Sequence, residues 1–427
     1  MNSAGNGQMV RPSPPDWAEL MARFFAYSPG DDGSVRVFFA PGRVNLLGEH
    51  TDYNGGFVLP AALEMGTWVV VRPRADGRFR FQSTLFPGFE VVDETDVIEN
   101  LTFRPEDGFA NYPRGVVWAM RKRLQLERGS DATDATERLL GADMLFHGDL
   151  PHSAGLSSSA SIELATAVAM NGLWELNWSA SDLAVLGQRA ENDFVGVQCG
   201  IMDQFSIAVG EKNQALSLDC GTLAYRLVPV ELRGHLLVIA NTHKPRELAD
   251  SKYNERRREC EQALSQLQTA RPDLRHLADI TPQEWPDLAR SLTNPVLLRR
   301  VRHVVFENYR AKTAPALLAQ GDLTVFGEQM NESHRSLRDD YEVTGPELDA
   351  LAEAAWEAPG CLGSRMTGAG FGGCTVSLVQ VSGVNRFVQQ VSLGYQKKVG
   401  RAPSFYLSGI GPGAREITSE VKSQWQF

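Results

Sequence analysis

A twenty-residue segment, residues 41–60, gathers side chains that could bind a small polar molecule. Within ten positions it places a fixed positive charge, a carboxamide, two carboxylates and an imidazole, which are Arg43, Asn45, Glu49, Asp52 and His50. Polar groups crowded on a glycine-rich loop suit a polyhydroxylated ligand, because each hydroxyl group needs a donor or an acceptor. The alternative is a solvated turn, and the density and variety of these side chains argue against it.

The residues around this segment have the patterns of β-strands. Residues 35–40 alternate as strand residues do, so we expect the polar cluster to lie on the loop that leaves this strand. Residues 68–74 and 78–82 form a second pair of strand-like runs, and the Asp76-Gly77 dipeptide between them predicts a hairpin. The polar loop is therefore expected to be supported by a sheet.

A second segment, residues 151–161, has the composition of a phosphate-binding loop. Its small residues include three consecutive serines, and it runs directly into an apolar helical pattern. Small residues let backbone N–H groups approach phosphate oxygens, and the N-terminus of a helix adds positive potential. Serine clusters also begin ordinary helices, which is the alternative. The segment lacks the glycines and the lysine of a Walker loop.

Three further positions carry groups that could do chemistry. Asp203 lies between apolar residues, an unusual setting for a carboxylate that only faces water, although a helix-capping role is equally compatible with the sequence. Glu191 lies at the end of the preceding helical stretch. Tyr253 lies on a charged helical run, where core packing is the alternative to ligand binding.

Residues 366–374 contain a formal Gly-x-Gly-x-x-Gly pattern, but the sequence around it excludes a dinucleotide-binding fold. That fold needs a helix after the glycines, whereas residues 374–380 here have the pattern of a strand. We therefore expect this segment to have an architectural role, with backbone contacts to a ligand possible.

Composition and the order of elements indicate a two-lobed α+β protein. The chain has 427 residues, of which 43% are apolar and 22% charged, as in globular proteins with a large core. Helical and strand patterns are mixed without a regular alternation. The helical patterns lie near residues 160–175, 182–194, 246–268, 300–357 and 384–394, and further strands near 215–240 and 404–410.

The charge and cysteine content exclude several classes of protein. The net charge of −10, from 52 acidic and 42 basic residues, argues against non-specific binding to nucleic acid or an anionic membrane. No apolar run approaches the roughly 20 residues that span a bilayer. Five cysteines without a Cys-x-x-Cys pair argue against a disulfide framework or a zinc site, and favour a reducing, cytoplasmic setting. The polar residues 1–20 are expected to form a loose tail.

Residues 41–60 closely resemble the sugar-recognition signature of galactokinases, which belong to the GHMP family of small-molecule kinases. The serine loop resembles the second GHMP motif, although Ser153 stands where the family usually has glycine, and residues 366–374 resemble the third. The resemblance extends over nearly the whole chain. It implies an N-terminal lobe over residues 21–225, with a mixed sheet and helices, and a C-terminal lobe over 226–427, with a ferredoxin-like α/β sandwich.

The resemblance also implies an activity, which is phosphorylation of galactose at its C1 hydroxyl by ATP with Mg²⁺. The products would be galactose 1-phosphate and ADP, the first committed step of galactose use by the Leloir pathway. Alternatives on the same scaffold are a kinase for N-acetylgalactosamine or arabinose, and a galactose sensor without catalysis. The intact serine loop and acidic residues argue against the sensor. We expect a cytoplasmic monomer with galactose and ATP as its partners.

Residue by residue, the resemblance implies a full set of site roles. Galactose would be bound by Glu49, His50, Thr51, Asp52, Gly200 and Tyr253. The nucleotide would be bound by Ser83, Ser153, Ala154, Gly155, Leu156, Ser157, Ser158 and Ser159, and Mg²⁺ by Ser159 and Glu191. Asp203 would be the general base, and Arg43 would either keep it ionised or stabilise the transferring phosphoryl group. Phe109 replaces a tryptophan that is common near the adenine pocket.

Overall fold

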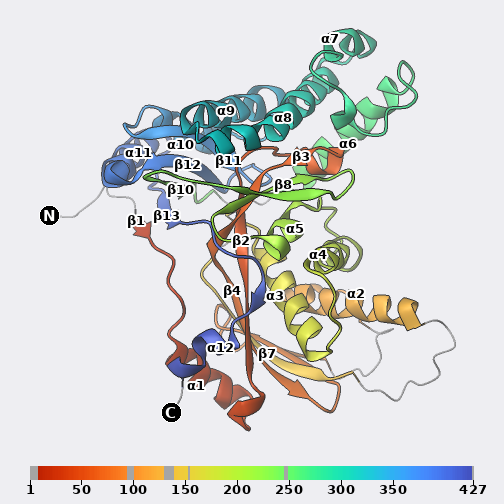
Figure 1. Cartoon of the computed structure of the whole chain (residues 1–427), viewed down its shortest axis with the longest axis vertical. Coiled ribbons are helices and arrows are strands. Elements are labelled where there is room, and N and C mark those ends of the chain that lie inside the picture. Colours follow the sequence, from red (N-terminus) through yellow and green to blue (C-terminus); the bar gives the residue numbers. More distant parts are fainter. Residues whose placement is uncertain (1–7, 94–100, 129–138, 152–153, 245–248, 426–427) are drawn as a thin grey trace.

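The computed structural model describes residues 8–93, 101–128, 139–151, 154–244 and 249–425. The chain forms two lobes, one above the other in Figure 1, each built on its own β-sheet. No described helix is long and apolar enough to cross a membrane. The predicted contact residue Ser153 and the first seven residues of the expected tail lie outside the described residues.

The N-terminal lobe contains a six-stranded mixed sheet with the strand order β14-β2-β4-β7-β5-β6. Its strands are β2 (Arg36–Asn45), β4 (Pro60–Arg74), β5 (Phe79–Ser83), β6 (Glu90–Asp93), β7 (Gly141–Gly148) and β14 (Arg415–Glu416). The helices of this lobe are α1 (Trp17–Tyr27), α2 (Asn111–Arg128), α3 (Ser158–Leu173), α4 (Ala180–Arg189), α5 (Met202–Val209) and α12 (Thr418–Val421). The predicted mixed sheet with helices is confirmed.

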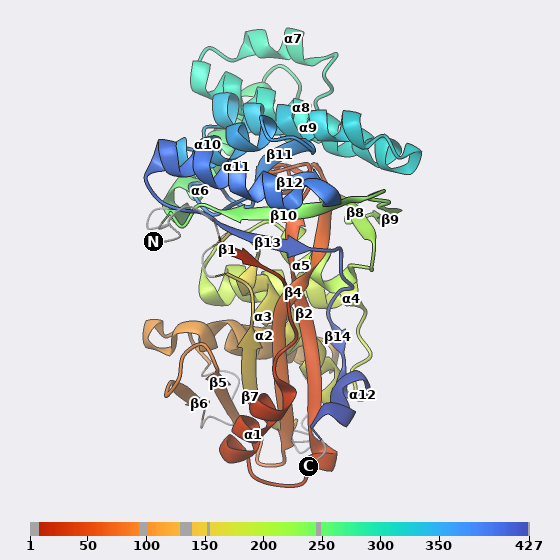
Figure 2. The ribbon, with the colours of Figure 1, turned by 90° about the vertical axis from the view of Figure 1, so that its left-hand side faces the viewer.

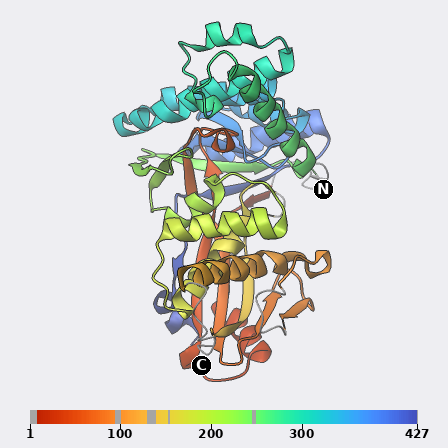
Figure 3. The ribbon, with the colours of Figure 1, turned by 90° about the vertical axis from the view of Figure 1, so that its right-hand side faces the viewer.

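The alternation in β2 explains why this sheet is covered on both faces. Phe38 and Ala40 are buried against α3 and α5, and Val37 and Phe39 are buried on the opposite face. That opposite face packs against α1 and α12, while α2 and α4 lie on the other side of the molecule (Figures 2 and 3). Alternate side chains of a strand point to opposite faces, so a strand with four consecutive apolar residues, as at 37–40, needs a covering layer on each face.

The predicted hairpin between β4 and β5 is wrong. A turn does form at residues 75–77, where Gly77 has a positive φ of 76°. However, β7 lies between the two strands, antiparallel to β4 and parallel to β5. The Asp-Gly pair indicates the local turn. The strand pairing instead depends on β7, which lies more than fifty residues further along the chain.

The C-terminal lobe has the predicted ferredoxin-like arrangement. Strands β10 (His235–Asn241), β11 (Cys361–Thr367), β12 (Cys374–Gln380) and β13 (Ser404–Ser408) form an antiparallel sheet in the order β13-β10-β12-β11. Helices α10 (Pro346–Trp356) and α11 (Val384–Val399) cover one face. Helices α8 (Pro295–Gln320) and α9 (Leu323–Ser336) pack against the other face, which also meets the N-terminal lobe.

The two ends of the chain cross between the lobes. Residues Gln8–Val10 form β1, which pairs in parallel with β13 at the edge of the C-terminal sheet, so these residues differ from the expected loose tail. At the other end, β14 pairs with β2 in the N-terminal sheet, and Trp425 packs against Trp17 of α1. The range 226–427 therefore contains strands of both sheets.

A small third sheet lies between the lobes. It contains β3 (Phe57–Val58), β8 (Gln214–Asp219) and β9 (Tyr225–Pro229), in the order β3-β8-β9. The helices α6 (Ala249–Leu267) and α7 (Trp285–Leu288) follow β10 along the chain, and in Figure 1 α6 lies at the right beside β3 and α7 at the top. The polar loop of residues 46–56 is thus held between β2, α8 and this small sheet.

Candidate active site

A cavity of about 310 Å³, here called the central cavity, opens between the lobes and collects most of the predicted sugar-binding residues. The predicted residues that line it are Arg43, Glu49, His50, Asp52, Gly200, Asp203 and Tyr253. Its other lining residues are Gly196, Val197, Cys199, Met202, Asn254, Gly368 and Ala369. Five separate stretches of sequence, from both lobes, therefore meet at one site.

Arg43 and Asp203 form the closest charged contact of the central cavity. Arg43 Nε and Nη2 donate to the two carboxylate oxygens of Asp203 at 2.7 and 2.8 Å, which is a bidentate pair. The arginine is buried, whereas the Asp203 side chain keeps 28% of its surface exposed toward the cavity. Arg43 lies on β2 itself, after a bulge at Pro41, and not on the loop that leaves the strand as predicted.

A third hydrogen bond occupies a further acceptor position of the Asp203 carboxylate. The Ser157 hydroxyl donates to Asp203 Oδ2 at 2.6 Å. A carboxylate offers about four acceptor positions, so three donors leave about one position free. In the structure the Ser157 side chain orients this carboxylate, and the predicted contact of Ser157 with the nucleotide stays a prediction.

Glu49 is a buried carboxylate on the wall of the central cavity. Arg365, which is fully buried on β11, donates to its Oε2 at 2.9 Å and also to the Asn45 carbonyl at 2.8 Å. Burial raises the pKa of Glu49 to about 7, because desolvation outweighs the attraction of Arg365 and Arg43. Arg365 thus joins the polar loop of one lobe to the sheet of the other.

Asp52 and Gly200 approach each other so closely that only glycine fits. A Cβ atom added at Gly200 would lie 1.7 Å from Asp52 Oδ2. Burial raises the pKa of Asp52 to about 6, the negative charge of Asp203 adds to this, and the backbone N–H groups of Tyr53 and Met202 oppose it. Gly200 therefore acts through the space that it leaves for the carboxylate.

His50 links the polar loop to the third glycine motif. Burial lowers the pKa of His50 to about 3, so the ring is neutral. Its Nε2 lies 3.2 Å from the Ala369 carbonyl, which can only accept, and the Tyr53 hydroxyl lies 2.9 Å from Nδ1. Nε2 therefore carries the proton, Nδ1 accepts from Tyr53, and the Tyr341 hydroxyl is 2.8 Å from that of Tyr53.

Two predicted sugar-binding residues differ in their placement. Tyr253, on α6, lines the central cavity with its ring centre 5.6 Å from that of His50 and 5.3 Å from that of Tyr53. Thr51 does not reach the cavity. Its hydroxyl is fully buried and hydrogen-bonds with the carbonyls of Gly48 and Phe57, at 2.8 and 2.7 Å, which fixes the loop.

The serine loop packs directly on Arg43 and on the third glycine motif. The carbonyls of Gly155 and Leu156 accept from Arg43, the first from Nη1 at 2.7 Å and the second from the backbone N–H at 3.1 Å. A Cβ at Gly368 would lie 2.6 Å from the Gly155 carbonyl, and one at Gly373 would lie 2.8 Å from the Ala154 carbonyl. The predicted architectural role of the glycine motif is consistent with these contacts.

The two predicted metal ligands lie within hydrogen-bonding distance of each other. The Ser159 hydroxyl bonds to Glu191, which lies in a π-helical turn, Ala190–Val195. Burial raises the pKa of Glu191 to about 7, and the charge of Asp203 raises it further. Such π-turns often mark functional sites. A buried carboxylate beside another negative charge is a setting that a bound cation would stabilise.

Glu163 and Gln204 surround this pair. Gln204 Nε2 donates to Glu191 at 2.6 Å and to Glu163 at 3.1 Å, and Glu163 Oε1 is buried without a protein partner. Among the described residues no group of three or more metal-binding side chains is arranged around one point. Mg²⁺ commonly takes one or two protein oxygens and completes its shell with water and phosphate, so this donor set fits it.

A second cavity, of about 180 Å³ and here called the aromatic cavity, lies on the other side of the serine loop. It contains the predicted residues Ser83, Ser158 and Ser159, and its apolar wall includes Phe86 and Phe109, whose rings stack 5.6 Å apart. The remaining lining residues are Thr67, Leu85, Tyr112, Phe146, His147, Gly148, Leu150 and Ile162. An apolar slot beside a serine loop suits a nucleoside base.

Several residues of the site were missed from the sequence. Arg365, Tyr341 and Glu163 are fully buried polar residues, which are uncommon unless they are paired, and Tyr53 is partly buried. Glu163 could have been found, because it lies among apolar residues one turn after the serine loop. Arg365 and Tyr341 come from distant segments without a pattern that marks them, so only the fold brings them here.

Comparison with known families assigns the fold and site to a class of enzymes. A model of the GHMP kinases N-terminal domain matches residues 111–211, and one of the GHMP kinases C-terminal domain matches residues 314–393. The mevalonate kinase of Methanococcus jannaschii has the same fold, with a TM-score of 0.61 over 89% of this chain and 99% of that chain at 18% identity. The protein is thus a GHMP-type small-molecule kinase.

More specific matches identify the family within this class. The galactokinase galactose-binding signature matches residues 23–73. The galactokinase of Fusobacterium nucleatum subsp. nucleatum is 47% identical over 92% of this chain and 97% of its own length, and that of Bacillus subtilis is 44% identical over 94% and 100%. The crystal structure of Lactococcus lactis galactokinase complexed with galactose has a TM-score of 0.85 at 43% identity, covering 93% of this chain and 99% of that chain. The chain belongs to the galactokinase family.

Proposed function

We propose that this protein is a galactokinase that transfers the γ-phosphoryl group of ATP to the C1 hydroxyl of α-D-galactose. The observation that carries the proposal is the bidentate Arg43–Asp203 pair in a cavity walled by further buried carboxylates. In the reaction, the C1 oxygen forms a bond to the γ-phosphorus and gives its proton to Asp203, while the bond from that phosphorus to the bridging oxygen breaks and ADP leaves.

The other residues of the central cavity would bind and orient the sugar. Glu49 and Asp52 can accept hydrogen bonds from sugar hydroxyls, and the Tyr253 ring offers an apolar face with a polar hydroxyl. His50 would act mainly through the loop, because both of its ring nitrogens are engaged with protein groups. A sugar hydroxyl that these buried groups cannot pair would cost much of the binding energy.

The aromatic cavity would hold the adenine base of ATP, and the loop at residues 154–159 would hold its phosphates. Ser158 and Ser159 begin α3, whose N-terminus favours negative charge. Ser159 and Glu191 would hold Mg²⁺, which would neutralise phosphate charge when bound. Arg43 donates to the Gly155 carbonyl of this loop. It would therefore lie close enough to the bound phosphates to stabilise charge on the transferring phosphoryl group.

Turnover of a sugar panel tests this function. The purified protein, with Mg-ATP, is expected to release ADP in the presence of galactose and to form galactose 1-phosphate, which phosphorus NMR identifies. Glucose, which differs at O4, is the matched control and is expected to be a poor substrate. N-acetylgalactosamine and arabinose test the related kinases, and a chelator should abolish turnover until Mg²⁺ is restored. Turnover of glucose equal to that of galactose, or none with galactose, would contradict the proposal.

A further inference from the structure

We propose that a third cavity, on the far side of the polar loop, is a second small-molecule site that binds a hexose monophosphate and thereby changes galactose binding. This cavity, here called the rear cavity, has a volume of about 360 Å³, similar to that of the central cavity. Binding to the rear cavity is independent of the proposed function, whereas its effect on galactose rests on that function.

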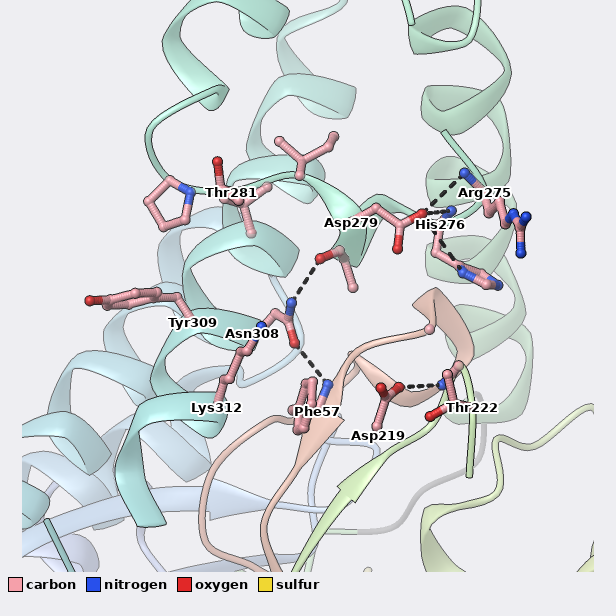
Figure 4. Close-up of a pocket in the computed structure, with 16 residues that line it drawn as sticks. Phe57, Asp219, Thr222, Arg275, His276, Asp279, Thr281, Asn308, Tyr309 and Lys312 are labelled. Atoms are coloured by element: carbon pink, nitrogen blue, oxygen red, sulfur yellow. Dashed lines mark hydrogen bonds and ion pairs between the residues drawn. The ribbon is translucent and has the colours of Figure 1, made fainter. Parts of the chain in front are cut away.

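The rear cavity is formed where four segments meet, as Figure 4 shows. Gly55 and Phe57 come from the polar loop and β3, Asp219 and Thr222 from the end of β8, and Asn308 and Lys312 from α8. The fourth segment, residues 275–282, closes the opposite side. None of these residues lines the central cavity or the aromatic cavity.

One short loop separates the rear cavity from the central cavity. Asp52 faces the central cavity, and Gly55, three positions later, faces the rear cavity. His276 packs directly on the loop, because a Cβ at Gly55 would lie 2.4 Å from the Cγ atom of its ring. A molecule that moves His276 or Phe57 would therefore press on the segment that places Asp52.

The rear cavity has Lys312 at one end and the carboxylates of Asp219 and Asp279, with Arg275 and His276 beside them, at the other, which is here called the acidic end. Figure 4 shows Lys312 and Tyr309 on α8 at one end, with Asp219, Thr222 and His276 toward the other. Within the described part of the chain, the exposed Lys312 has no carboxylate partner, and its ammonium lies 5.4 Å from the centre of the Phe57 ring. An unpaired ammonium beside an aromatic ring suits a phosphate group attached to a sugar.

The acidic end offers acceptors for sugar hydroxyls. Asp219 Oδ1 accepts from the Gly221 N–H at 3.0 Å, and Asp279 Oδ2 accepts from the N–H groups of Arg275 and His276 at 3.1 and 2.9 Å. In each carboxylate the hydrogen bonds hold one oxygen and leave the second to a ligand. A hexose monophosphate fits both ends of the rear cavity, because its phosphate dianion can contact Lys312 while its sugar hydroxyls donate to the carboxylates.

Helix α8 provides the physical connection to the sugar site. Asn308 accepts from the Phe57 N–H at 2.8 Å and donates to the Ala278 carbonyl at 2.8 Å, so it bridges the walls of the rear cavity. The fully buried Glu307, which directly precedes Asn308, accepts from the Gly48 N–H at 2.8 Å, and about one turn earlier His303 Nε2 lies 3.0 Å from the Glu49 carbonyl. The helix therefore holds the polar loop at both of its ends.

Calorimetry with the central and aromatic cavities occupied tests binding to the rear cavity. The full-length protein is saturated with galactose and a non-hydrolysable Mg-ATP analogue, and galactose 1-phosphate or glucose 6-phosphate is then titrated. We expect one binding event per chain, weakened about tenfold or more by Lys312→Glu, since a charge-assisted hydrogen bond is replaced by repulsion. Lys397→Glu, on the exposed face of α11, makes the same charge change elsewhere and should leave binding intact.

Further measurements compare the whole hexose monophosphate with inorganic phosphate and check that the variants fold. Thr222→Trp, which would fill the acidic end of the rear cavity, should also weaken binding of the hexose monophosphate. Near-normal galactose turnover by Lys312→Glu and Thr222→Trp, measured without added hexose monophosphate, would show that both variants fold. Binding of only one hexose phosphate identifies that sugar as the ligand, and binding of both supports the class. Inorganic phosphate that binds as well as either, or binding unchanged in both variants, would overturn the proposal.

Steady-state kinetics tests the coupling. At saturating Mg-ATP, the hexose phosphate that binds should change the galactose KM severalfold in the wild type and in Lys397→Glu, but not in Lys312→Glu. Competition at the central cavity alone would act equally on all three proteins, and that result would overturn the coupling. An absence of galactose turnover in every protein would contradict the proposed function and leave the binding experiment to decide the rear cavity.

Discussion

The central cavity and the aromatic cavity differ in the kind of contact that they offer a ligand. The charged residues that line the central cavity come from the N-terminal lobe, uncharged residues of the C-terminal lobe complete the wall, and the buried Arg365 of that lobe donates to Glu49. The aromatic cavity is formed by the N-terminal lobe alone and is lined largely by rings such as Phe86 and Phe109. In the proposed function, selectivity for the sugar would therefore depend on how the lobes are placed, whereas binding of the base would depend on one lobe.

The difference has a consequence for how each site tolerates change. A buried charge that loses its partner costs the full desolvation of that charge, whereas a stacked ring that is replaced by another apolar group loses only part of its contact. Changes in the central cavity should therefore have large and specific effects, and changes in the aromatic cavity should have small ones. Five experiments examine this contrast.

The largest effect is expected from Asp203→Asn, because it removes the proton acceptor and the charge that pairs with Arg43. We expect kcat to fall by about two to four orders of magnitude, the range of general-base contributions, with galactose affinity much less changed. Calorimetric galactose binding beside turnover measures both, and Asp193→Asn, an exposed carboxylate, is the control. A near-normal kcat would mean that phosphoryl stabilisation by Arg43 is the main contribution.

Asp52→Ala is expected to act on galactose binding more than on chemistry. Loss of hydrogen bonds to a charged group should raise the galactose KM by about 10- to 100-fold, with the KM for ATP unchanged. A loss in kcat would follow only if the sugar is also misaligned. If the two KM values rise together, the central and aromatic cavities are not separate in function, and the contrast fails.

Gly200→Ala tests the close approach to Asp52 without changing any charged group. The added methyl cannot lie 1.7 Å from Asp52 Oδ2, so the carboxylate must move. We expect the galactose KM to rise about tenfold, since hydrogen bonds to a displaced carboxylate weaken. Gly383→Ala, where the nearest atom to the added Cβ is 3.6 Å away, should leave the KM unchanged. Equal effects of both changes would indicate a general loss of stability.

The pH dependence of galactose binding should report the buried carboxylates. The pKa of Glu49 is raised to about 7 and that of Asp52 to about 6 by burial, so both become neutral as the pH falls through these values. A neutral carboxyl is a weaker acceptor, and the galactose KM should rise about fivefold between pH 8 and pH 6. In Asp52→Asn only the Glu49 part of this dependence should remain. A flat profile in the wild type would contradict the assignment of these groups to sugar binding.

The smallest effect is expected in the aromatic cavity. Phe109→Leu keeps an apolar side chain but removes the ring that stacks on Phe86. We expect the KM for ATP to rise about threefold, which corresponds to part of one aromatic contact, and the galactose KM to stay the same. Initial rates at varied ATP and fixed galactose measure the change. A fall in kcat of an order of magnitude or more would show that this ring also positions the phosphates.

The local parts of the molecule were readable from the sequence. Residues 160–175 predict a helix that the structure places at Ser158–Leu173, and the strand at Cys374–Gln380 has the predicted bounds. The polar loop and the serine loop were also recognised with their chemistry, because each is a continuous run of residues. Turns, caps, hydrophobic periodicity and close-packed motifs depend on neighbours in the sequence, so the sequence alone contains them.

Only the tertiary structure decided which distant residues support the site. Nothing local indicates that Arg365 reaches Glu49 or that Glu307 holds the Gly48 N–H, and a polar residue that looks exposed in sequence can be fully buried. Local sequence likewise gives no sign that β7 lies between β4 and β5, or that β14 lies beside β2. These contacts join segments that are far apart in the chain. They form because each lobe must pair its strands and cover its apolar faces, and these conditions depend on several distant segments at once.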